Sequence, residues 1–321
     1  MTTILELKEL IRRIYRKYEA VIVPVIKFII ALILLLQIRS SFGYNEKLSA
    51  VPVCLILALL SSVLPLGATI FFSAVVILAD FYALSLEIFL STAAVFAIVA
   101  LIYLRFSPKT GYMVVLTPLS FLIHIPFIMP AAGALLFTPT SAVSVACGTF
   151  LYYYLHGIKE TAPALLAAED STAAEKVTTI VNQITGNREM ILVLLVFVLM
   201  TVMIYVIRRM AIKRSWTIAI IAGFMTEFLI LIGGFLTLGI EGKTLALVLG
   251  NLASVGLAFV LKFFFFHVDY KRTERVQFED DDYYYYVRAI PKIKMPVQEK
   301  KVKKITGESR HTVGRQEKKE E

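Results

Sequence analysis

The sequence predicts an all-α protein that crosses a membrane several times, and two observations support this prediction. Of the 321 residues, 58% are hydrophobic and only 18% are charged, and the mean hydropathy is +0.75. Soluble globular chains are about half apolar and about a quarter charged, so this composition excludes disordered chains and most soluble enzymes. The charge is also uneven: residues 267–321 hold 14 Lys and Arg and 11 Asp and Glu, whereas residues 20–266 hold 14 and 10. The long apolar part suits lipid, and the charged tail suits water.

Eight segments are long and apolar enough to be interpreted as membrane spans, since a helix needs about 20 mostly apolar residues to cross the hydrocarbon core. They are residues 20–37, 48–65, 67–84, 85–104, 113–137, 190–207, 216–238 and 244–266. A further apolar stretch, 138–155, remains unassigned. The second, third and fourth spans are joined by almost no loop, so we expect tight antiparallel hairpins there, with a sharp turn at Pro65–Gly67.

Basic residues in short loops predict the orientation of the spans. Residues 1–19 carry five Lys and Arg, and the loop at 208–214 is the most basic internal loop, so both are placed in the cytoplasm. Both termini are then cytoplasmic and the loop 156–189 is outside, which requires an odd number of crossings in 113–155. Three full helices need about 60 residues, and this segment has 43. We therefore expect one crossing plus a re-entrant or broken piece.

Two amphipathic helices are expected outside the spans. In residues 1–19 the apolar side chains share one helical face, with the basic residues largely opposite; they are Leu7, Leu10, Ile11, Ile14 and Tyr18. Such a helix either lies on an anionic membrane leaflet or packs on the protein's own cytoplasmic loops, and both alternatives stay open. The second helix is expected at 172–185, between a capping box at Thr172–Glu175 and Gly186.

The sequence carries no motif of an enzyme or a cofactor site. It lacks an HExxH, a GxSxG, a CxxC pair and a nucleotide-binding fingerprint, so we expect no enzyme activity, no metal and no other cofactor. The two cysteines, Cys54 and Cys147, lie in apolar runs and are expected to be structural. Nothing in the tail suggests a nucleic-acid partner.

Ionisable residues at membrane depth are the main candidates for a functional site, because they are costly in lipid and usually face a partner or a watery path. Glu227 and His124 each lie about eleven residues into spans that run in the same direction, and Lys27 lies about seven residues into its span. A lysine stem can bridge that difference, so these three side chains are expected to form one buried cluster. Alternatively, Lys27 extends to the cytoplasmic interface and Glu227 is statically paired or protonated. Asp80 is a fourth candidate, slightly nearer the outer face.

Prolines and small polar residues interrupt the predicted helix in the 113–155 segment. The candidate residues are Pro126, Pro130, Pro139, Ser141 and Ser144. Irregular backbone at membrane depth occurs only where it is buried in protein or lines a cavity, and transporters use discontinuous helices at binding sites near the midplane. The alternative is a kinked helix packed through small residues.

Close helix packing is expected in the last two spans. Their glycines, together with the Gly250-x-x-x-Ser254 motif, allow two backbones to approach, and Asn251 is placed to form a hydrogen bond across the contact. This pattern is more typical of a structural contact than of a binding site.

The tail combines an acidic run, four tyrosines and a basic end. Acidic residues occupy 279–282, Tyr283–Tyr286 follow, and the Tyr-Val-Arg-Ala-Ile stretch predicts a short strand. Residues 299–321 are expected to be disordered. An eight-span core with this acidic, tetra-tyrosine, Val-Arg-Ala-Ile-Pro-Lys tail resembles uncharacterised bacterial membrane proteins; the resemblance implies a bacterial inner membrane and no particular function. Anionic lipid or cytoplasmic proteins are the partners expected at the basic tail.

Three parts are therefore expected: a cytoplasmic amphipathic helix at 1–19, a transmembrane domain at 20–266 in the lipid bilayer, and a cytoplasmic tail at 267–321. The leading hypothesis is a permease, or the membrane subunit of a transport system, for an unidentified small solute at the inner (plasma) membrane. The alternative is a non-transporting scaffold that recruits cytoplasmic partners through its tail. A cavity touching Glu227 or residues 126–148 would favour transport, and a tightly packed core without one would favour a scaffold.

Overall fold

A computed structural model of the chain describes residues 2–45, 48, 50–167, 173–210, 212, 214–240, 242, 244–265, 274–279 and 284–289. The chain divides into two compact units, Thr3–Phe266 and His267–Glu321. The described part of the first unit contains helices and their connections, and that of the second contains two strands. The described residues are thus almost entirely helical, with a short β-hairpin in the tail.

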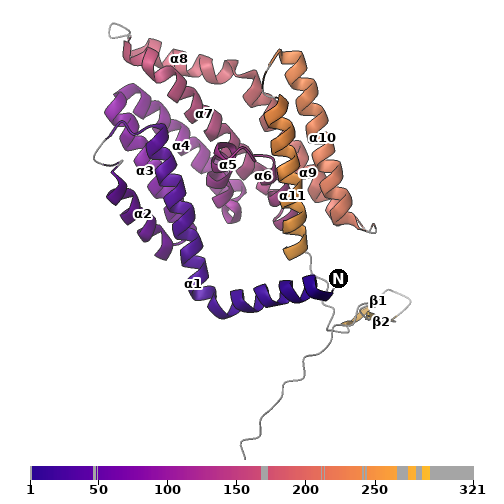
Figure 1. Cartoon of the computed structure of the whole chain (residues 1–321). Coiled ribbons are helices and arrows are strands. Elements are labelled where there is room, and N and C mark those ends of the chain that lie inside the picture. Colours follow the sequence, from indigo (N-terminus) through magenta and orange to yellow (C-terminus); the bar gives the residue numbers. More distant parts are fainter. Residues whose placement is uncertain are drawn as a thin grey trace, which may run out of the picture. The chain divides into compact units, whose positions relative to one another are not determined.

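The described part of the first unit forms eleven α-helices and one short 3₁₀ helix (Figure 1). In chain order they are α1 (Thr2–Ser41), α2 (Val51–Val63), α3 (Leu66–Leu84), α4 (Leu86–Phe106), η1 (Pro108–Thr110), α5 (Tyr112–Leu122), α6 (Ile128–Leu136), α7 (Ser141–Ala167), α8 (Ala173–Gly186), α9 (Arg188–Arg209), α10 (Ser215–Leu238) and α11 (Thr244–Phe265). Among the described residues, six segments are long and apolar enough to cross a membrane: Arg13–Ser41, Gly67–Leu84, Leu86–Phe106, Arg188–Arg209, Ser215–Leu238 and Thr244–Phe265. The chain is a multi-pass membrane protein.

Two of the eight expected spans are shorter than a span needs, so the count of eight is not confirmed. α2 has 13 residues, and the expected span 113–137 is divided into α5, with 11 residues, and α6, with nine. At 1.5 Å per residue these helices are about 20, 16 and 14 Å long, against a hydrocarbon core of about 30 Å. The unassigned stretch 138–155 instead belongs to α7, whose 27 residues extend for about 40 Å.

The tight hairpins expected between neighbouring helices are confirmed. Only Leu64 and Pro65 separate α2 from α3, and only Ser85 separates α3 from α4. Pro65 and Ser85 both have extended backbone conformations, which lets the chain reverse within one or two residues. The amphipathic helix expected at 172–185 is α8, which ends at Gly186 as predicted. Thr172 of the expected capping box lies outside the described residues.

The segment 113–155 is broken, as expected, and the break lies just after α5. His124 has a left-handed backbone conformation, with a φ of 59°. Its N–H donates to the carbonyl oxygen of Phe121 (3.1 Å), and the N–H of Ile125 donates to that of Ser120 (3.0 Å). This pair of hydrogen bonds is the pattern that commonly closes a helix C-terminus, usually around a glycine.

After this break the chain runs back along α5. The ring of Tyr112, at the start of α5, meets the ring of Phe137, just past the end of α6, with 5.5 Å between centroids. The two short helices are therefore antiparallel, and we call residues 112–136 the α5–α6 hairpin. His124 lies at its tip.

Arg208, near the end of α9, joins this hairpin to α10. Its guanidinium donates hydrogen bonds to the carbonyl oxygens of Leu135 and Phe137. It also lies over the ring of Trp216, 5.2 Å from the centroid. The last carbonyls of a helix have no partner within the helix, so Arg208 satisfies groups that α6 leaves free. The ends of α6 and α9 and the start of α10 consequently meet.

The last and first helices reach the same end of the bundle. The Lys262 ammonium, in the last turn of α11, donates a hydrogen bond to the hydroxyl of Thr217 in α10. Lys8 of α1 lies 5.1 Å from the ring centroid of Phe263. We call this end, where cationic side chains of α1, α9 and α11 gather, the basic end. In Figure 1 it lies at the bottom, and α8 lies at the opposite end.

Three clusters of buried apolar residues are present, and the two larger ones divide the bundle. The first is built mainly by α6, α9, α10 and α11, which we call the packed half. The second is built by α1, α2 and α3, with Ile88 of α4, Tyr154 and Ile158 of α7 and Ile180 of α8. We call α1–α4 the open half, and α5 and α7 lie between the two halves.

The described part of the tail is a two-stranded antiparallel hairpin. β1 (Glu274–Glu279) pairs with β2 (Tyr284–Ala289), from Glu274 opposite Ala289 to Glu279 opposite Tyr284. The strand predicted from the Tyr-Val-Arg-Ala-Ile stretch is confirmed by β2, whereas β1 was not expected. Residues 280–283, which complete the acidic run, and residues 290–321, which contain the C-terminal Lys and Arg residues, lie outside the described residues.

Candidate functional site

Glu227 is one of two almost completely buried acidic side chains that the sequence places at membrane depth, and Asp80 is the other. It lies on α10, is only 1% exposed, and accepts a hydrogen bond from the Asn251 amide of α11 at 3.2 Å. Its Oε1 atom has no hydrogen-bond partner among the described residues. The hydrogen bond predicted for Asn251 between the last two spans is thus present, and Glu227 is its acceptor.

The tip of the α5–α6 hairpin touches α11 beside this pair. A Cβ atom at Gly250 would lie 2.7 Å from the carbonyl oxygen of His124 and 3.1 Å from the Phe127 ring. Only a glycine lets the two backbones approach so closely. One turn further along α11, the Ser254 hydroxyl is buried without a partner among the described residues. The His124 side chain itself is exposed.

Lys27 does not take part in this group, so the expected cluster of Lys27, Glu227 and His124 is not formed. The Lys27 ammonium donates a hydrogen bond to the carbonyl oxygen of Leu64, 3.2 Å away, just past the end of α2. Glu227 belongs instead to the α10–α11 contact in the packed half. The expectation compared only depths in the membrane, whereas Lys27 on α1 lies in the open half and Glu227 on α10 lies in the packed half.

Asp80 lies in the open half and fastens the connection between α1 and α2. It is fully buried, and its Oδ1 accepts a hydrogen bond from the backbone N–H of Asn45 at 3.1 Å. Burial, and to a smaller extent the Asp80 carboxylate, raise the pKa of Tyr44 in the same connection. This geometry suits a structural anchor of the loop.

The residues singled out in the broken segment are mostly enclosed by neighbouring helices. Pro126, Pro130, Ser141 and Ser144 are buried, and Pro139 is partly exposed. The Ser144 hydroxyl forms a hydrogen bond with that of Thr110 at 3.0 Å. The hydroxyl of Ser141 lies 3.0 Å from the Cβ position of Gly133 and has no partner among the described residues.

Close contact between α5 and α7 continues this dense packing. A Cβ atom at Gly148 would lie 2.7 Å from the Thr117 Cβ and 2.9 Å from the Val114 carbonyl oxygen. Two cavities in the described part of the chain, of about 650 and 270 Å³, are lined neither by Glu227 nor by any residue from 126 to 148. The broken segment thus packs through small residues.

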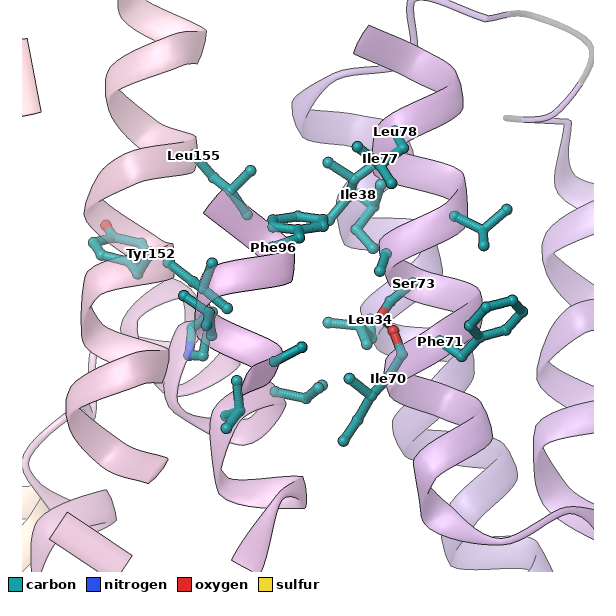
Figure 2. Close-up of a pocket in the computed structure, with 18 of the residues that line it drawn as sticks. Leu34, Ile38, Ile70, Phe71, Ser73, Ile77, Leu78, Phe96, Tyr152 and Leu155 are labelled. Atoms are coloured by element: carbon teal, nitrogen blue, oxygen red, sulfur yellow. Dashed lines mark hydrogen bonds between the residues drawn. The ribbon is translucent and has the colours of Figure 1, made fainter. Parts of the chain in front are cut away.

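A large cavity lies elsewhere, between the open half and α5 and α7. Its volume is about 650 Å³. Figure 2 shows its side chains converging from four helices: Leu34 and Ile38 of α1; Ile70, Ser73 and Ile77 of α3; Phe96 of α4; and Tyr152 and Leu155 of α7. Val114, Val115, Pro118 and Leu122 of α5 complete the wall. We call this space the lateral cavity.

Most of the lateral cavity is apolar, and its few polar groups are spread along its length. Gln37 and Ser41 lie near the end of α1, with 3.4 Å between the Gln37 amide nitrogen and the Ser41 hydroxyl. His156 and Lys159 of α7 also line it, and His156 lies 3.3 Å from the Glu160 carboxylate. The cavity therefore offers a long apolar surface with a cationic group at one position.

A smaller cavity of about 270 Å³ adjoins it along α1. Ile70 and Val115 line both cavities, while Tyr15, Lys27 and Tyr112 line only the smaller one. Neither cavity could be predicted from the sequence, because most residues that line them are apolar and resemble those of a buried core.

The described residues contain no group of three His, Cys, Asp or Glu side chains that could hold a metal ion. No family model, curated protein or solved structure matches the chain.

Proposed function

We propose that this protein is an integral membrane permease, or the membrane subunit of a transport system, and that its solute is lipophilic or amphiphilic. The observation that carries the proposal is the lateral cavity of about 650 Å³. Ligand sites commonly measure about 300–1,000 Å³ and combine apolar walls with a few polar groups that orient the ligand. The cavity meets both conditions.

The chemistry of the wall favours an apolar solute over a small polar one. Aliphatic and aromatic side chains of α1, α3, α4, α5 and α7 form most of it. A polar solute would lose its hydration there without gaining hydrogen bonds, which is unfavourable. An amphiphile can place its chain against this wall and an anionic group near Lys159.

The charge distribution supports a topology with both termini in the cytoplasm. Lys and Arg are enriched in cytoplasmic segments, so the basic end faces the cytoplasm. The α5–α6 hairpin, which begins and ends at the basic end, then enters the membrane from the cytoplasm and returns to it. The proposed topology has eight passes in the inner (plasma) membrane: the six long apolar helices, together with α7 and the short helix α2, which is proposed to cross where its neighbours shield its ends.

The packed half has a supporting role in this proposal. Transport of a polar solute past Glu227 would need a cavity there, and the cavities described above lie elsewhere. Glu227, Asn251 and the hairpin tip are proposed to hold α6, α10 and α11 together as a rigid side. The open half moves against this side when the lateral cavity takes up or releases its solute.

A filling experiment tests the proposal. Ala93 and Ala97 of α4 both line the lateral cavity, whereas Ala94 and Ile98 are exposed on the same helix and do not line it. The double variant Ala93→Phe/Ala97→Phe should fill the cavity, and Ala94→Phe/Ile98→Phe is the matched control. The full-length protein in bilayer nanodiscs is labelled with a photoactivatable fatty acid, and the labelled peptides are identified by mass spectrometry.

We expect labelling of cavity peptides from α3, α4 and α7 in the wild type and the control. In the filled variant, labelling of these peptides should fall to the level of ordinary lipid-facing peptides. If the filled variant is labelled as strongly as the control, the lateral cavity is not a binding site. The scaffold alternative would then be preferred, and the tail hairpin of β1 and β2 supports it, because exposed strand edges can pair with a strand of a partner.

A further inference from the structure

The N-terminal section of α1 is an amphipathic helix that a bend separates from the membrane-spanning section. Helix α1 extends from Thr2 to Ser41, but the backbone of Tyr18 is not helical, with φ −113° and ψ 20°. In Figure 1 the chain bends sharply there, and the section before the bend runs across the basic end of the bundle. We call residues 2–18 the surface helix.

The apolar face of the surface helix is not covered by the rest of the protein. Its side chains are 40–54% exposed: Leu7, Leu10, Ile11, Ile14 and Tyr18. At 100° per residue they occupy one side of the helix. The sequence left open whether this face packs on the protein's own loops, and the exposure of these side chains argues against that alternative.

The charged residues lie on the rest of the helix surface. Arg13 and Arg16 fall on the side away from the apolar face, Lys17 flanks it, and all three are exposed. Lys8 also lies off the apolar face, over the ring of Phe263 in α11. The cation–π contact fixes the helix against the basic end while its apolar face remains uncovered.

We infer that the surface helix binds the anionic surface of the membrane, with its apolar face at the boundary between headgroups and acyl chains. An amphipathic helix with apolar side chains on one face and Lys and Arg on the other lies in this plane. Covalent continuity adds a second argument: the same helix continues beyond Tyr18 into a membrane span. The bend therefore lies where the chain passes from the membrane surface into its interior.

Fluorescence quenching in vesicles tests this inference on the full-length chain. Trp216 is the protein's single tryptophan, and Trp216→Phe keeps an aromatic ring beside Arg208. In this background, Leu10→Trp places a probe on the apolar face, and Arg13→Trp places the matched control on the polar face. Both positions are exposed, so neither substitution disturbs a buried contact.

The protein is reconstituted into phosphatidylcholine vesicles, with and without phosphatidylglycerol, whose acyl chains are brominated close to the headgroup. We expect the probe at position 10 to be quenched roughly threefold more strongly than the probe at position 13. Adding phosphatidylglycerol should deepen that quenching, and high salt should reverse the increase. A further variant combines Leu10→Trp with Arg13→Glu/Arg16→Glu/Lys17→Glu. It should lose only the additional quenching that phosphatidylglycerol causes.

Equal quenching at the two positions, or no quenching by bromine, would overturn the inference. The apolar face would then be covered by a second copy of the chain or by another protein. Quenching that is strong but indifferent to phosphatidylglycerol would overturn the part that assigns an anionic surface. None of these readouts involves the lateral cavity, so they are independent of the proposed transport function.

Discussion

The packed half and the open half of this bundle are both built from apolar helices but differ in packing. In the packed half and along α5 and α7, some glycines lie so close to side chains or backbone of neighbouring segments that an added Cβ would lie 2.3–2.9 Å from them, at Gly148, Gly223 and Gly250. Both halves also contain glycines with space around them, because a Cβ at Gly67 in the open half or at Gly256 in the packed half would meet nothing within 4 Å, so the cavity carries the contrast. The lateral cavity opens on the side of the open half. Packing density therefore distinguishes the packed half, as a supporting region, from the lateral cavity, as a candidate binding region. Hydropathy alone does not measure this difference.

Removal of Arg208 should have the largest effect on the packed half. Its guanidinium satisfies carbonyl groups at the end of α6 and lies over the rings of Tyr205 and Trp216. Hydrogen bonds to charged groups contribute about 1.5–3 kcal/mol, so Arg208→Ala should lower the free energy of unfolding by about that amount. Unfolding in detergent is measured by the rate at which a thiol-reactive dye labels Cys54 and Cys147, which are buried in the folded protein.

The neighbouring arginine is the matched control. Arg209 is exposed, and its guanidinium donates to the Tyr205 hydroxyl at 2.9 Å. Exposed interactions of this kind contribute roughly 0–1 kcal/mol, so Arg209→Ala should have little effect. Equal losses for the two variants would mean that Arg208 acts as a surface charge and does not hold the hairpin.

Overpacking is the next largest expected effect. Gly148→Ala should lower the free energy of unfolding by about 1–3 kcal/mol, because the new methyl group would lie 2.9 Å from a backbone oxygen of α5. Gly256→Ala is the control, since a Cβ there meets nothing within 4 Å. The same thiol-access assay measures both. If Gly148→Ala is as stable as the control, α5 and α7 are not in tight contact and the packed region is smaller than described.

Much of the fold can be predicted from the spacing of apolar residues and from the positions of proline and glycine in the sequence. The helices, the hairpins at Pro65 and Ser85, the break in 113–155 and the end of α8 at Gly186 are all predictable, because each depends on a local pattern of apolar residues, proline or glycine. The strand β2 is likewise indicated by its own residues. Its partner β1 is not, because strand pairing depends on residues further along the chain.

Features that depend on how helices face one another could not be predicted. The prolines indicate a break in the helix, but they do not show that the chain reverses. The reversal depends on the left-handed backbone of His124, and histidine is not a residue type that predicts this conformation. From the sequence, Arg208 is predicted only to be a charged residue at the cytoplasmic side. Its hydrogen bond to the carbonyl oxygen of Leu135 is visible only in the folded structure. The walls of the lateral cavity consist of apolar residues from five helices, and no single segment distinguishes them from a core.

The smallest expected effect is the coupling between the two halves. Lys27 interacts with Leu64 of the open half, and Glu227 interacts with Asn251 of the packed half. Substitutions at distant sites without a shared partner add within about 0.3–0.5 kcal/mol, whereas residues in contact couple by about 0.5–3 kcal/mol. The double-mutant cycle of Lys27→Ala with Glu227→Ala should therefore be additive, and that of Glu227→Ala with Asn251→Ala should not.

Both cycles use the same unfolding assay, and the second acts as the positive control for the first. Coupling of Lys27 to Glu227 as strong as that of Asn251 to Glu227 would restore the cluster that membrane depth alone suggested. Such a result would require another conformation, in which α1 moves across the lateral cavity toward α10. Additivity in the first cycle and coupling in the second would instead show that the charge in the open half and the carboxyl group in the packed half stabilise their own halves separately.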